Sequence, residues 1–397
     1  MSEPSAVVTA RGAERISGGH LWIYRTDVRS VQAASGDVVR VTDERGRLVG
    51  RAFWSDGSQI ALRFLTCRDE PVDRAFFAER IRAAAEYRST VVEDTDAWRV
   101  VHAEGDLLPS LIVDRYADVL VIQTLSQGAE KRKAELVDIL VEQFAPRGIL
   151  ERNEPKARLL EHLPQSVSVL YGEVPEQVDA RMNDVRLRLD LRRGQKTGTF
   201  LDQRENYRAA SHYAAGEVLD CFSYQGGFAL HLARHAQSVE AVDISGEALA
   251  AARINTELND CHNVAFREGN VFDILKEYDQ AGRRFDTVVL DPPAFAKTRS
   301  ALEAASRGYK EINLRSLRLL RPGGILVTCS CSYHLAESHF GEILWEAAVD
   351  VGKRIRVVER RGQSRDHPVL LTVPETYYLK CLITQSLESK EAQKENH

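Results

Sequence analysis

The sequence predicts an α/β protein whose C-terminal half is a doubly wound, Rossmann-like sheet, preceded by a small β-barrel and a small α+β module. In the second half of the chain, short apolar segments of strand length alternate with helix-like segments, which is typical of βαβ units. The first 75 residues contain short β-rich segments separated by turn residues. The length of 397 residues is sufficient for two or three domains.

The N-terminal domain is expected over residues 1–75. Segments 38–41, 48–53 and 60–65 are rich in β-forming residues, and Asp43-Glu44-Arg45-Gly46 lies between the first two. Such a turn between two apolar runs is typical of a hairpin. The segment 60–65 also alternates apolar with polar or small residues, as in a strand with one buried face.

The central module is expected over residues 76–190. Its first helix is predicted over residues 72–90, where Asp73 is suited to cap the N-terminus. Apolar segments at 111–114 and 119–124 predict strands, and the spacing of Leu136, Ile139, Leu140 and Phe144 predicts a helix over 130–144.

The C-terminal domain is expected over residues 191–387, and the polar segment 388–397 is expected to be a disordered tail. Helices are predicted at 226–235 and 246–258. Parallel strands are predicted at 217–219, 238–242, 264–268, 287–290 and 325–328. An open sheet of this kind binds its ligand beyond the carboxyl ends of its strands.

Composition limits the class of protein. Hydrophobic residues make up 44% and charged residues 28%, as in globular proteins. No apolar run reaches the roughly 20 residues that a membrane span needs, and no signal peptide is recognisable, so we expect a cytoplasmic protein. The six cysteines contain no C-x-x-C pair, and His231 and His235 lack further ligands nearby. Neither a disulfide framework nor a metal is expected.

The formal net charge of −5 implies that any nucleic-acid binding depends on local basic stretches. Between residues 181 and 215 eight basic residues oppose four acidic ones, and between 350 and 365 six oppose two. Either stretch is equally compatible with ordinary solvated surface.

A cofactor site is predicted where the first parallel strand ends. The segment 218–228 leaves the strand at Asp220 and enters a helix through Gly226 and Gly227, without the G-x-G-x-x-G pattern that holds a pyrophosphate. Asp243 ends the next strand, where a carboxylate can bind ribose hydroxyls. Asn270 follows the third strand and is placed to bind an adenine edge. A nucleoside without phosphates fits, and S-adenosylmethionine (SAM) is such a cofactor, with an ammonium group for Asp220.

Two further loops carry residues suited to chemistry on a nucleic-acid base. Asp291-Pro292-Pro293 follows the fourth strand, and the prolines make the loop stiff. Its carboxylate can accept a hydrogen bond from a base amino group, and Phe295 can either stack on a base or belong to the core. Cys329-Ser330-Cys331 ends the fifth strand. A thiolate that adds to carbon 6 of cytosine makes carbon 5 nucleophilic enough to accept a methyl group. The residues alone leave Cys329 and Cys331 as alternatives.

The whole chain resembles the bacterial 23S rRNA cytosine-5 methyltransferases called ribosomal large subunit methyltransferase I. The resemblance lies in residues 18–24 (Gly-Gly-His-Leu-Trp-Ile-Tyr), in 196–204 (Lys-Thr-Gly-Thr-Phe-Leu-Asp-Gln-Arg), in Asp291-Pro292-Pro293 with Phe295 and Lys297, and in His367-Pro368 with Tyr378-Leu379-Lys380. It implies a PUA RNA-binding domain, a SAM-dependent catalytic domain, a 23S rRNA or large-subunit precursor substrate, and a homodimer.

The resemblance also implies residue roles. The family's nucleophile lies in a Ser-Cys-Ser setting, which corresponds to Cys331, with Asp291 in the neighbouring loop. The expected cofactor-binding residues are Lys196, Thr197, Phe200, Asp220, Phe222, Gly226, Asp243, Asn270 and Asp291. Two alternatives stay open: methylation of a base nitrogen, which needs no cysteine, and an RNA-binding ribosome assembly factor without catalytic activity.

Overall fold

The computed structural model describes residues 3–296 and 298–387, which fall into two compact units. The first takes in the chain up to Ala180, together with Leu189–Leu201 and Arg365–Thr376; the second takes in Arg181–Arg188, Asp202–Ser364 and the residues from Tyr377 onward. The first unit is therefore built from three separate stretches of chain. Lys297 and the expected disordered tail, 388–397, lie outside the described residues.

The N-terminal part of the first unit is a six-stranded sheet in the order β2-β6-β5-β4-β1-β3. The predicted strands correspond to β4, β5 and β6, whose inward residues Val39, Val41 and Leu62 are fully buried. Helix α1 and the strands β1 to β3 were not predicted. The elements are β1 (Ser5–Val8), α1 (Ala10–Ser17), β2 (Trp22–Tyr24), η1 (Arg25–Asp27), β3 (Val28–Gln32), β4 (Val38–Asp43), β5 (Leu48–Trp54) and β6 (Ile60–Thr66).

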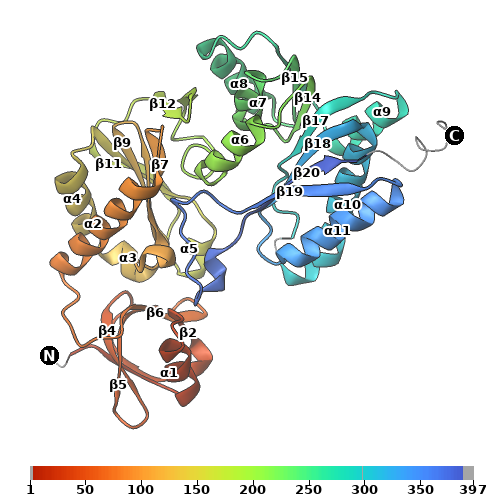
Figure 1. Cartoon of the computed structure of the whole chain (residues 1–397). Helices are drawn as coiled ribbons and strands as arrows, with labels where there is room; N and C mark the ends of the chain where they lie inside the picture. The colour runs from red at the N-terminus through yellow and green to blue at the C-terminus, as the bar shows by residue number, and fades with distance from the viewer. Residues whose placement is uncertain (1–2, 297, 388–397) are drawn as a thin grey trace. The chain divides into compact units, whose positions relative to one another are not determined.

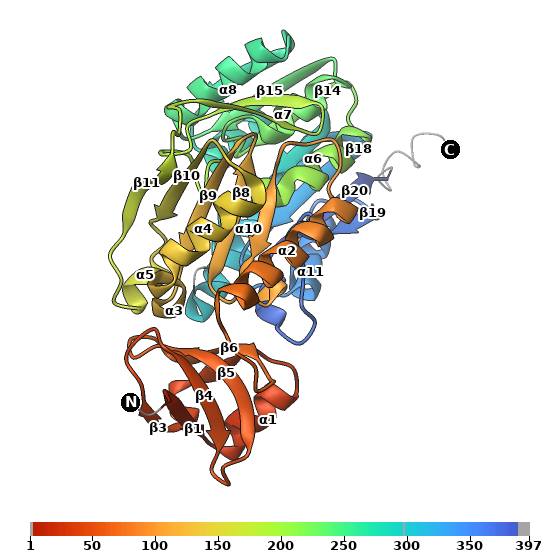
Figure 2. The ribbon, with the colours of Figure 1, turned by 90° about the vertical axis from the view of Figure 1, so that its left-hand side faces the viewer.

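The rest of the first unit is a five-stranded sheet in the order β11-β10-β9-β8-β7, with α2 and α4 across one face (Figure 2). Asp73 caps α2 as predicted, since its carboxylate accepts from the Phe76 N–H. The helix predicted over 130–144 is instead two helices, because Arg132 leaves helical geometry between them. The elements are α2 (Arg74–Val91), β7 (Ala97–His102), η2 (Ala103–Asp106), β8 (Leu111–Tyr116), β9 (Val119–Thr124), α3 (Gln127–Lys131), α4 (Lys133–Phe144), β10 (Gly148–Asn153), α5 (Ala157–Leu160) and β11 (Ser166–Gly172).

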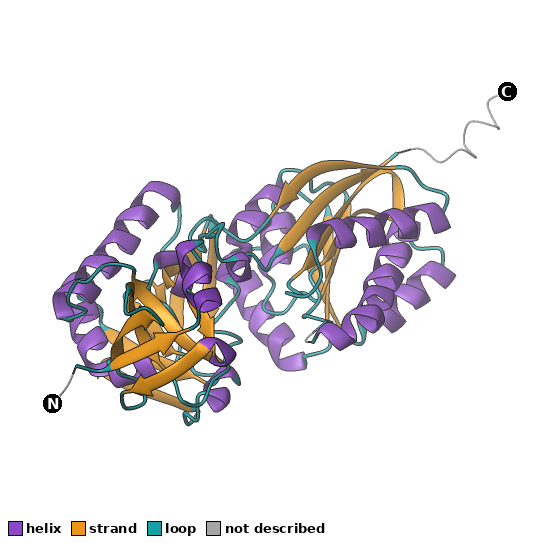
Figure 3. Ribbon diagram, turned by 90° about the horizontal axis from the view of Figure 1, so that it is seen from below, coloured by secondary structure: helices purple, strands orange, loops and turns teal. Residues whose placement is uncertain are grey.

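The second unit is built on a seven-stranded sheet in the order β16-β15-β14-β17-β18-β20-β19. All five predicted parallel strands are present, and α9, α10 and α11 pack on one face of the sheet while α6, α7 and α8 lie on the other (Figures 1 and 3). The elements are α6 (Arg204–Ser211), β14 (Glu217–Cys221), α7 (Gly227–Ala233), β15 (Ser238–Asp243), α8 (Gly246–Leu258), β16 (Val264–Glu268), α9 (Val271–Gln280), β17 (Phe285–Leu290), η4 (Arg299–Ala301), α10 (Leu302–Leu319), β18 (Leu320–Ser330) and α11 (Glu337–Asp350).

Two antiparallel strands extend the sheet beyond the parallel series. The strand β20 (Lys380–Ser386) pairs with β18, and β19 (Ile355–Arg361) pairs with β20 at the edge. Neither was predicted. The remaining elements are the hairpin strands β12 (Val178–Met182) and β13 (Val185–Leu189), and the short helices η3 (Leu201–Gln203) and η5 (Pro374–Thr376).

Candidate functional site

The loop after β14 has an unusual backbone. Phe222, Tyr224 and Gly226 have φ angles of 64°, 51° and 85°, in a region that residues with a Cβ rarely adopt. Helix α7 follows at Gly227, where a Cβ would lie only 2.5 Å from the Tyr207 ring. Strained backbone is concentrated at ligand-binding loops, which supports the prediction that Phe222 and Gly226 border a cofactor site.

Asp220 is the penultimate residue of β14, and its buried carboxylate is only partly hydrogen-bonded. Its side chain is fully buried; its Oδ2 accepts from the Ser223 hydroxyl at 2.6 Å and from the Ala229 N–H at 3.0 Å. Its buried Oδ1 has no hydrogen-bond partner among the described residues. Burial, reinforced by the charges of Asp291 and Asp243, raises the pKa of Asp220 to about 7. An ammonium group, such as the one SAM carries, would satisfy both the orphaned oxygen and the charge.

Asp243 and Asn270 lie at the ends of β15 and β16. The two oxygens of the half-buried Asp243 carboxylate accept from the backbone N–H groups of Tyr224, at 2.8 Å, and Ser245, at 2.9 Å. Each oxygen retains a second lone pair for a ribose hydroxyl. Asn270 caps α9, because its side-chain oxygen accepts from the Phe272 N–H at 2.9 Å. The amide NH₂ group of this exposed residue is not part of the cap, so it can donate to an adenine ring.

Asp291 lies at the end of β17, directly beside the end of β14. Its N–H donates to the Cys221 carbonyl at 3.4 Å, and the Gln203 amide donates to its Oδ1 at 2.8 Å. The Gln203 oxygen in turn accepts from Asn206 at 2.7 Å, and the Asn206 oxygen accepts from Arg361 at 3.0 Å. This chain of hydrogen bonds from α6 and β19 fixes the orientation of the carboxylate.

The loop after β17 and the loop after β18 are joined, as expected for neighbouring parallel strands. The Ser332 hydroxyl accepts from the Ala296 N–H at 3.1 Å and contacts the Tyr309 hydroxyl at 3.0 Å. The Cys331 thiol donates weakly to the Pro292 carbonyl, with 3.9 Å between sulfur and oxygen. The predicted carboxylate and the predicted nucleophile therefore belong to two loops that contact each other.

The two candidate cysteines differ in their surroundings. Cys329 is fully buried opposite Cys381 in the β18–β20 pair. Burial raises the pKa of the Cys329 thiol well above its usual value, which disfavours a reactive thiolate. Cys331 is only partly buried and lies just beyond the strand. Cys221 and Cys381 are buried packing residues, as expected; Cys261, expected to be the same, is only partly buried.

Phe295 belongs to a cluster of aromatic rings. Its ring centroid lies 4.7 Å from that of Tyr309, 5.9 Å from that of Phe272 and 6.5 Å from that of Phe222. The ring packs against the core of the second unit. Of the two expected roles, the packing role describes the observed contacts.

Lys196, Thr197 and Phe200 belong to the first unit. The Lys196 ammonium lies 4.5 Å from the centre of the Phe200 ring, a cation–π contact. The Thr197 hydroxyl is buried, donates to Asp114 at 2.6 Å and lies 2.9 Å from the Tyr116 hydroxyl. Thr197 therefore has a structural role within this unit, and its expected role in cofactor binding stays a prediction.

Two polar side chains next to the predicted site were not singled out from the sequence. Gln203 orients Asp291, and Lys380 is a buried lysine whose Nζ donates to the Ser332 carbonyl at 2.7 Å. Both lie within the segments that carry the family resemblance. The sequence feature that could have drawn attention to Lys380 is its position directly before the apolar run Cys381-Leu382-Ile383.

His231 packs inside the second unit. Its Nδ1 lies 2.7 Å from the Gly227 carbonyl and its Nε2 lies 3.1 Å from Asn183, and burial lowers its pKa to about 4. Among the described residues, no group of three or more His, Cys, Asp or Glu side chains is arranged to hold a metal ion.

The two basic stretches differ in how their charges are used. In the first, Arg204 is buried and Arg192 donates to the Val174 and Pro175 carbonyls at 3.1 Å, so part of its charge serves internal contacts. In the second, Arg354 and Arg356 are exposed at the edge strand β19.

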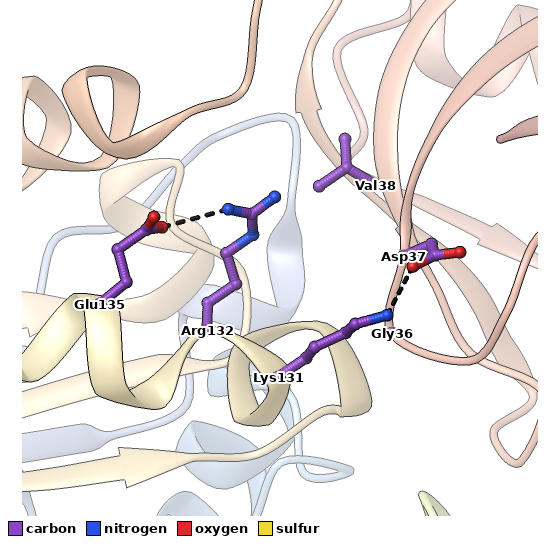
Figure 4. Close-up of a pocket in the computed structure, with 6 residues that line it drawn as sticks. All are labelled: Gly36, Asp37, Val38, Lys131, Arg132 and Glu135. Atoms are coloured by element: carbon purple, nitrogen blue, oxygen red, sulfur yellow. Dashed lines mark hydrogen bonds and ion pairs between the residues drawn. The ribbon is translucent and has the colours of Figure 1, made fainter. Parts of the chain in front are cut away.

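The first unit has a pocket of about 290 Å³ between the start of β4 and the α3–α4 junction (Figure 4). Its charges are paired with one another: Lys131 with Asp37 at 2.6 Å, and Arg132 with Glu135 at 3.1 Å. The Lys131–Asp37 pair joins the two elements, whereas Arg132 and Glu135 pair within the helical segment, and we assign the pocket no part in the reaction.

Comparison with known proteins agrees with this fold. Residues 99–382 match the family of S-adenosylmethionine-dependent methyltransferases, and residues 7–67 match a PUA-like domain. The crystal structure of SMU.776 complexed with SAH is 20% identical, covers 96% of this chain and 99% of its own, and has a TM-score of 0.83. The class is therefore a SAM-dependent methyltransferase with an N-terminal PUA-like domain, and SAM is its cofactor.

Similar proteins identify the family within this class of methyltransferases. Ribosomal RNA large subunit methyltransferase I of Shewanella amazonensis is 41% identical over 92% of this chain and 95% of its own length. The protein of the same name from Tolumonas auensis is 40% identical over 93% of this chain and 96% of its own. The chain belongs to the ribosomal RNA large subunit methyltransferase I family, and the predicted family and fold class are confirmed. Within the described residues, no helix is both long and apolar enough to span a membrane.

Proposed function

We propose that this protein methylates carbon 5 of a cytosine in 23S rRNA, with Cys331 as the nucleophile. The observation that carries the proposal is the contact between the partly exposed Cys331 thiol and the Asp291-Pro292-Pro293 loop, whereas Cys329 is buried in the sheet. The relatives' name supports ribosomal RNA of the large subunit as the substrate.

The proposed chemistry uses addition followed by elimination. The Cys331 thiolate forms a bond to carbon 6 of the cytosine, which leaves carbon 5 electron-rich. Bound SAM supplies an electrophilic methyl group for carbon 5. A base then removes the carbon 5 proton, the carbon 6–sulfur bond breaks, and its electron pair returns to Cys331 as the thiolate. Asp291, oriented by Gln203, is proposed to position the cytosine by accepting from its amino group.

The side chains proposed to hold SAM surround the ends of β14, β15 and β16. Asp220 would bind the ammonium group through the orphaned Oδ1, Asp243 the ribose hydroxyls, and Asn270 the adenine edge. The strained loop residues Phe222 and Gly226 would border the cofactor. For Lys196, Thr197 and Phe200, of the predicted entry motif, a role in SAM binding stays a proposal drawn from the family resemblance alone.

The remaining predictions concern partners and location. We propose that the PUA-like domain contributes to binding of 23S rRNA or a large-subunit precursor. The expected homodimer, the cytoplasmic location and the domain boundaries near residues 75 and 190 stay predictions.

Covalent trapping tests the nucleophile. A 5-fluorocytidine RNA carries fluorine where the proton must leave, so the enzyme with SAM is expected to accumulate an adduct that survives a denaturing gel. Cys331→Ala should abolish both adduct and methyl transfer. Cys329→Ala is the matched control, because it removes a thiol two residues away and should retain the adduct.

Three other results would reject parts of the proposal. If the adduct were lost in Cys329→Ala but kept in Cys331→Ala, the nucleophile would be Cys329 and the assignment of Cys331 would be wrong. Methyl transfer that persists in Cys331→Ala would favour a base-nitrogen methyltransferase. Absence of transfer to any ribosomal RNA or precursor particle would favour an assembly factor.

A further inference from the structure

Lys380 is a buried cation at the start of β20, the strand that lies beside β18 (Figure 1). It pairs with Ser330 in the antiparallel register of β20 and β18, and only 2% of it is exposed. Its Nζ donates to the Ser332 carbonyl at 2.7 Å and to the Tyr378 carbonyl at 3.0 Å. In the described part of the chain, no carboxylate lies within ion-pair distance of this ammonium group.

A buried ammonium group without a carboxylate is costly. Burial lowers the pKa of Lys380 to about 8, and the negative charges that oppose this lowering are those of Cys331 and Glu337. Glu337 already accepts from the Tyr377 hydroxyl at 2.8 Å and from Arg360 at 3.5 Å. Cys331 therefore remains as the nearby group whose ionisation would give Lys380 a counter-charge.

The Pro292 carbonyl does not favour the ionised form of Cys331. The Pro292 carbonyl accepts from the thiol, and a hydrogen bond donated by the neutral form stabilises that form. Tyr309, which contacts Ser332, and Asp291, which begins the neighbouring loop, are neutral or negative groups. Lys380 is a cation that reaches this loop from β20, the strand paired with β18, because its Nζ bonds the carbonyl of Ser332, next to Cys331.

We propose that Lys380 is a positioning residue whose ammonium group stabilises the Cys331 thiolate. The inference rests on the proposed function, because it assigns Lys380 a role through the proposed nucleophile. The thiol proton leaves to solvent and Lys380 keeps its own proton, so that a thiol beside an ammonium becomes a thiolate beside an ammonium. The carbonyls of Ser332 and Tyr378 hold the ammonium in place throughout.

Alkylation of the native protein tests this without RNA or SAM. The rate of iodoacetamide modification of Cys331 is followed by peptide mass spectrometry from pH 6 to 9.5. We expect Lys380→Met to slow modification at pH 7 by about tenfold or more and to move the pH profile to higher pH, because an opposite charge a few ångströms away shifts a pKa by about one unit or more. Lys380→Arg keeps the charge and should restore most of the rate.

Lys353→Met is the matched control. Lys353 is half-buried, also has its pKa lowered to about 8 by burial, and donates to two carbonyls, those of Leu317 and Leu320, away from the Cys331 loop. This variant should leave the Cys331 profile unchanged. A Lys380→Met profile equal to that of the unmutated protein, or an equal shift in Lys353→Met, would overturn the inference.

A reciprocal measurement covers the case in which Lys380→Met does not fold. Coupled groups shift each other's titration, so Cys331→Ser should lower the pKa of Lys380, followed by NMR of the ¹⁵N-labelled Nζ. An unchanged Lys380 titration would overturn the inference. Since neither experiment reads methyl transfer, failure of the trapping test with an intact Lys380 effect would reject the cytosine chemistry alone.

Discussion

Asp220 is buried, and one of its carboxylate oxygens lacks a partner among the residues that the structure describes, so in the absence of SAM it destabilises the folded protein. Its folded pKa of about 7 exceeds the ordinary value of 3.8. A carboxyl group with a raised folded pKa is stabilising only below its unfolded pKa; its cost grows as pH rises from about 4 to about 7 and then stays constant. At about 1.4 kcal/mol per unit, the shift corresponds to at most about 4 kcal/mol.

Asp220→Asn removes the charge and keeps the shape. We expect the cofactor-free variant to be more stable than the unmutated protein at pH 8, by about 1–2 kcal/mol, and the gain to be smaller at pH 5. SAM affinity should fall about tenfold or more, because a charge-assisted hydrogen bond to the ammonium is lost. Urea unfolding at both pH values and calorimetric titration with SAM measure the two effects. Equal stability at pH 8 would contradict the assignment of a buried, uncompensated carboxylate.

The start of α7 depends on the absence of a side chain at Gly227. A Cβ there would lie 2.5 Å from the Tyr207 ring, so Gly227→Ala forces Tyr207 or the helix to move. We expect a loss of about 1–3 kcal/mol in the free energy of unfolding, together with weaker SAM binding, since the strained loop ends at this residue. Denaturant titration and SAM binding provide the measurements.

Gly341 in α11 is the matched control for that substitution. A Cβ at Gly341 meets nothing within 4 Å, and an alanine inside a helix is more favourable than a glycine by about 1 kcal/mol. Gly341→Ala should therefore be neutral or stabilising. If both substitutions destabilised the protein equally, the contact with Tyr207 would not be the cause.

The elements that the sequence predicted are those with a strong local pattern. The five parallel strands alternate along the chain with helix-like segments, and the positions of their ends placed Asp220, Asp291 and Cys331 at one edge of the sheet. The edge strand β19 was interpreted only as a basic stretch, because its charges and exposed face hide the strand pattern. Its pairing partner β20 runs antiparallel to β18, so the alternation of strands and helices in βαβ units gave no reason to expect it.

The contacts between distant segments could not be predicted. Gln203 bonds Asp291 across 88 residues, and Lys380 bonds the Ser332 carbonyl across 48. Periodicity describes each segment separately and does not state which polar side chains meet. The residues that bear the proposed chemistry could therefore be predicted, whereas those that orient them could not.

At the scale of the molecule, the first unit is completed by segments that are distant in sequence. Arg99 on β7 pairs with Asp114, its N–H donates to Asp366 at 2.8 Å, and Asp114 also accepts from Thr197. The segments that hold Thr197 and Asp366 thus converge on one buried ion pair. Folding of this unit requires chain from near residue 366, so it cannot be complete until most of the protein has been synthesised.

Substitution of Asp366 tests whether the segment near residue 366 is needed to complete the first unit, because its fully buried carboxylate accepts from the Arg99 N–H. Asp366→Ala leaves that donor buried without an acceptor, and we expect the free energy of unfolding to fall by about 2–3 kcal/mol. Amide hydrogen exchange along β7 should accelerate in parallel. Asp366→Asn keeps an acceptor oxygen and should lose less.

The exposed Asp350, which pairs with Lys310 at 3.0 Å, is the control: Asp350→Ala should cost less than about 1 kcal/mol. Equal losses in Asp366→Ala and Asp350→Ala would show that the segment near residue 366 is not needed to hold β7 in place.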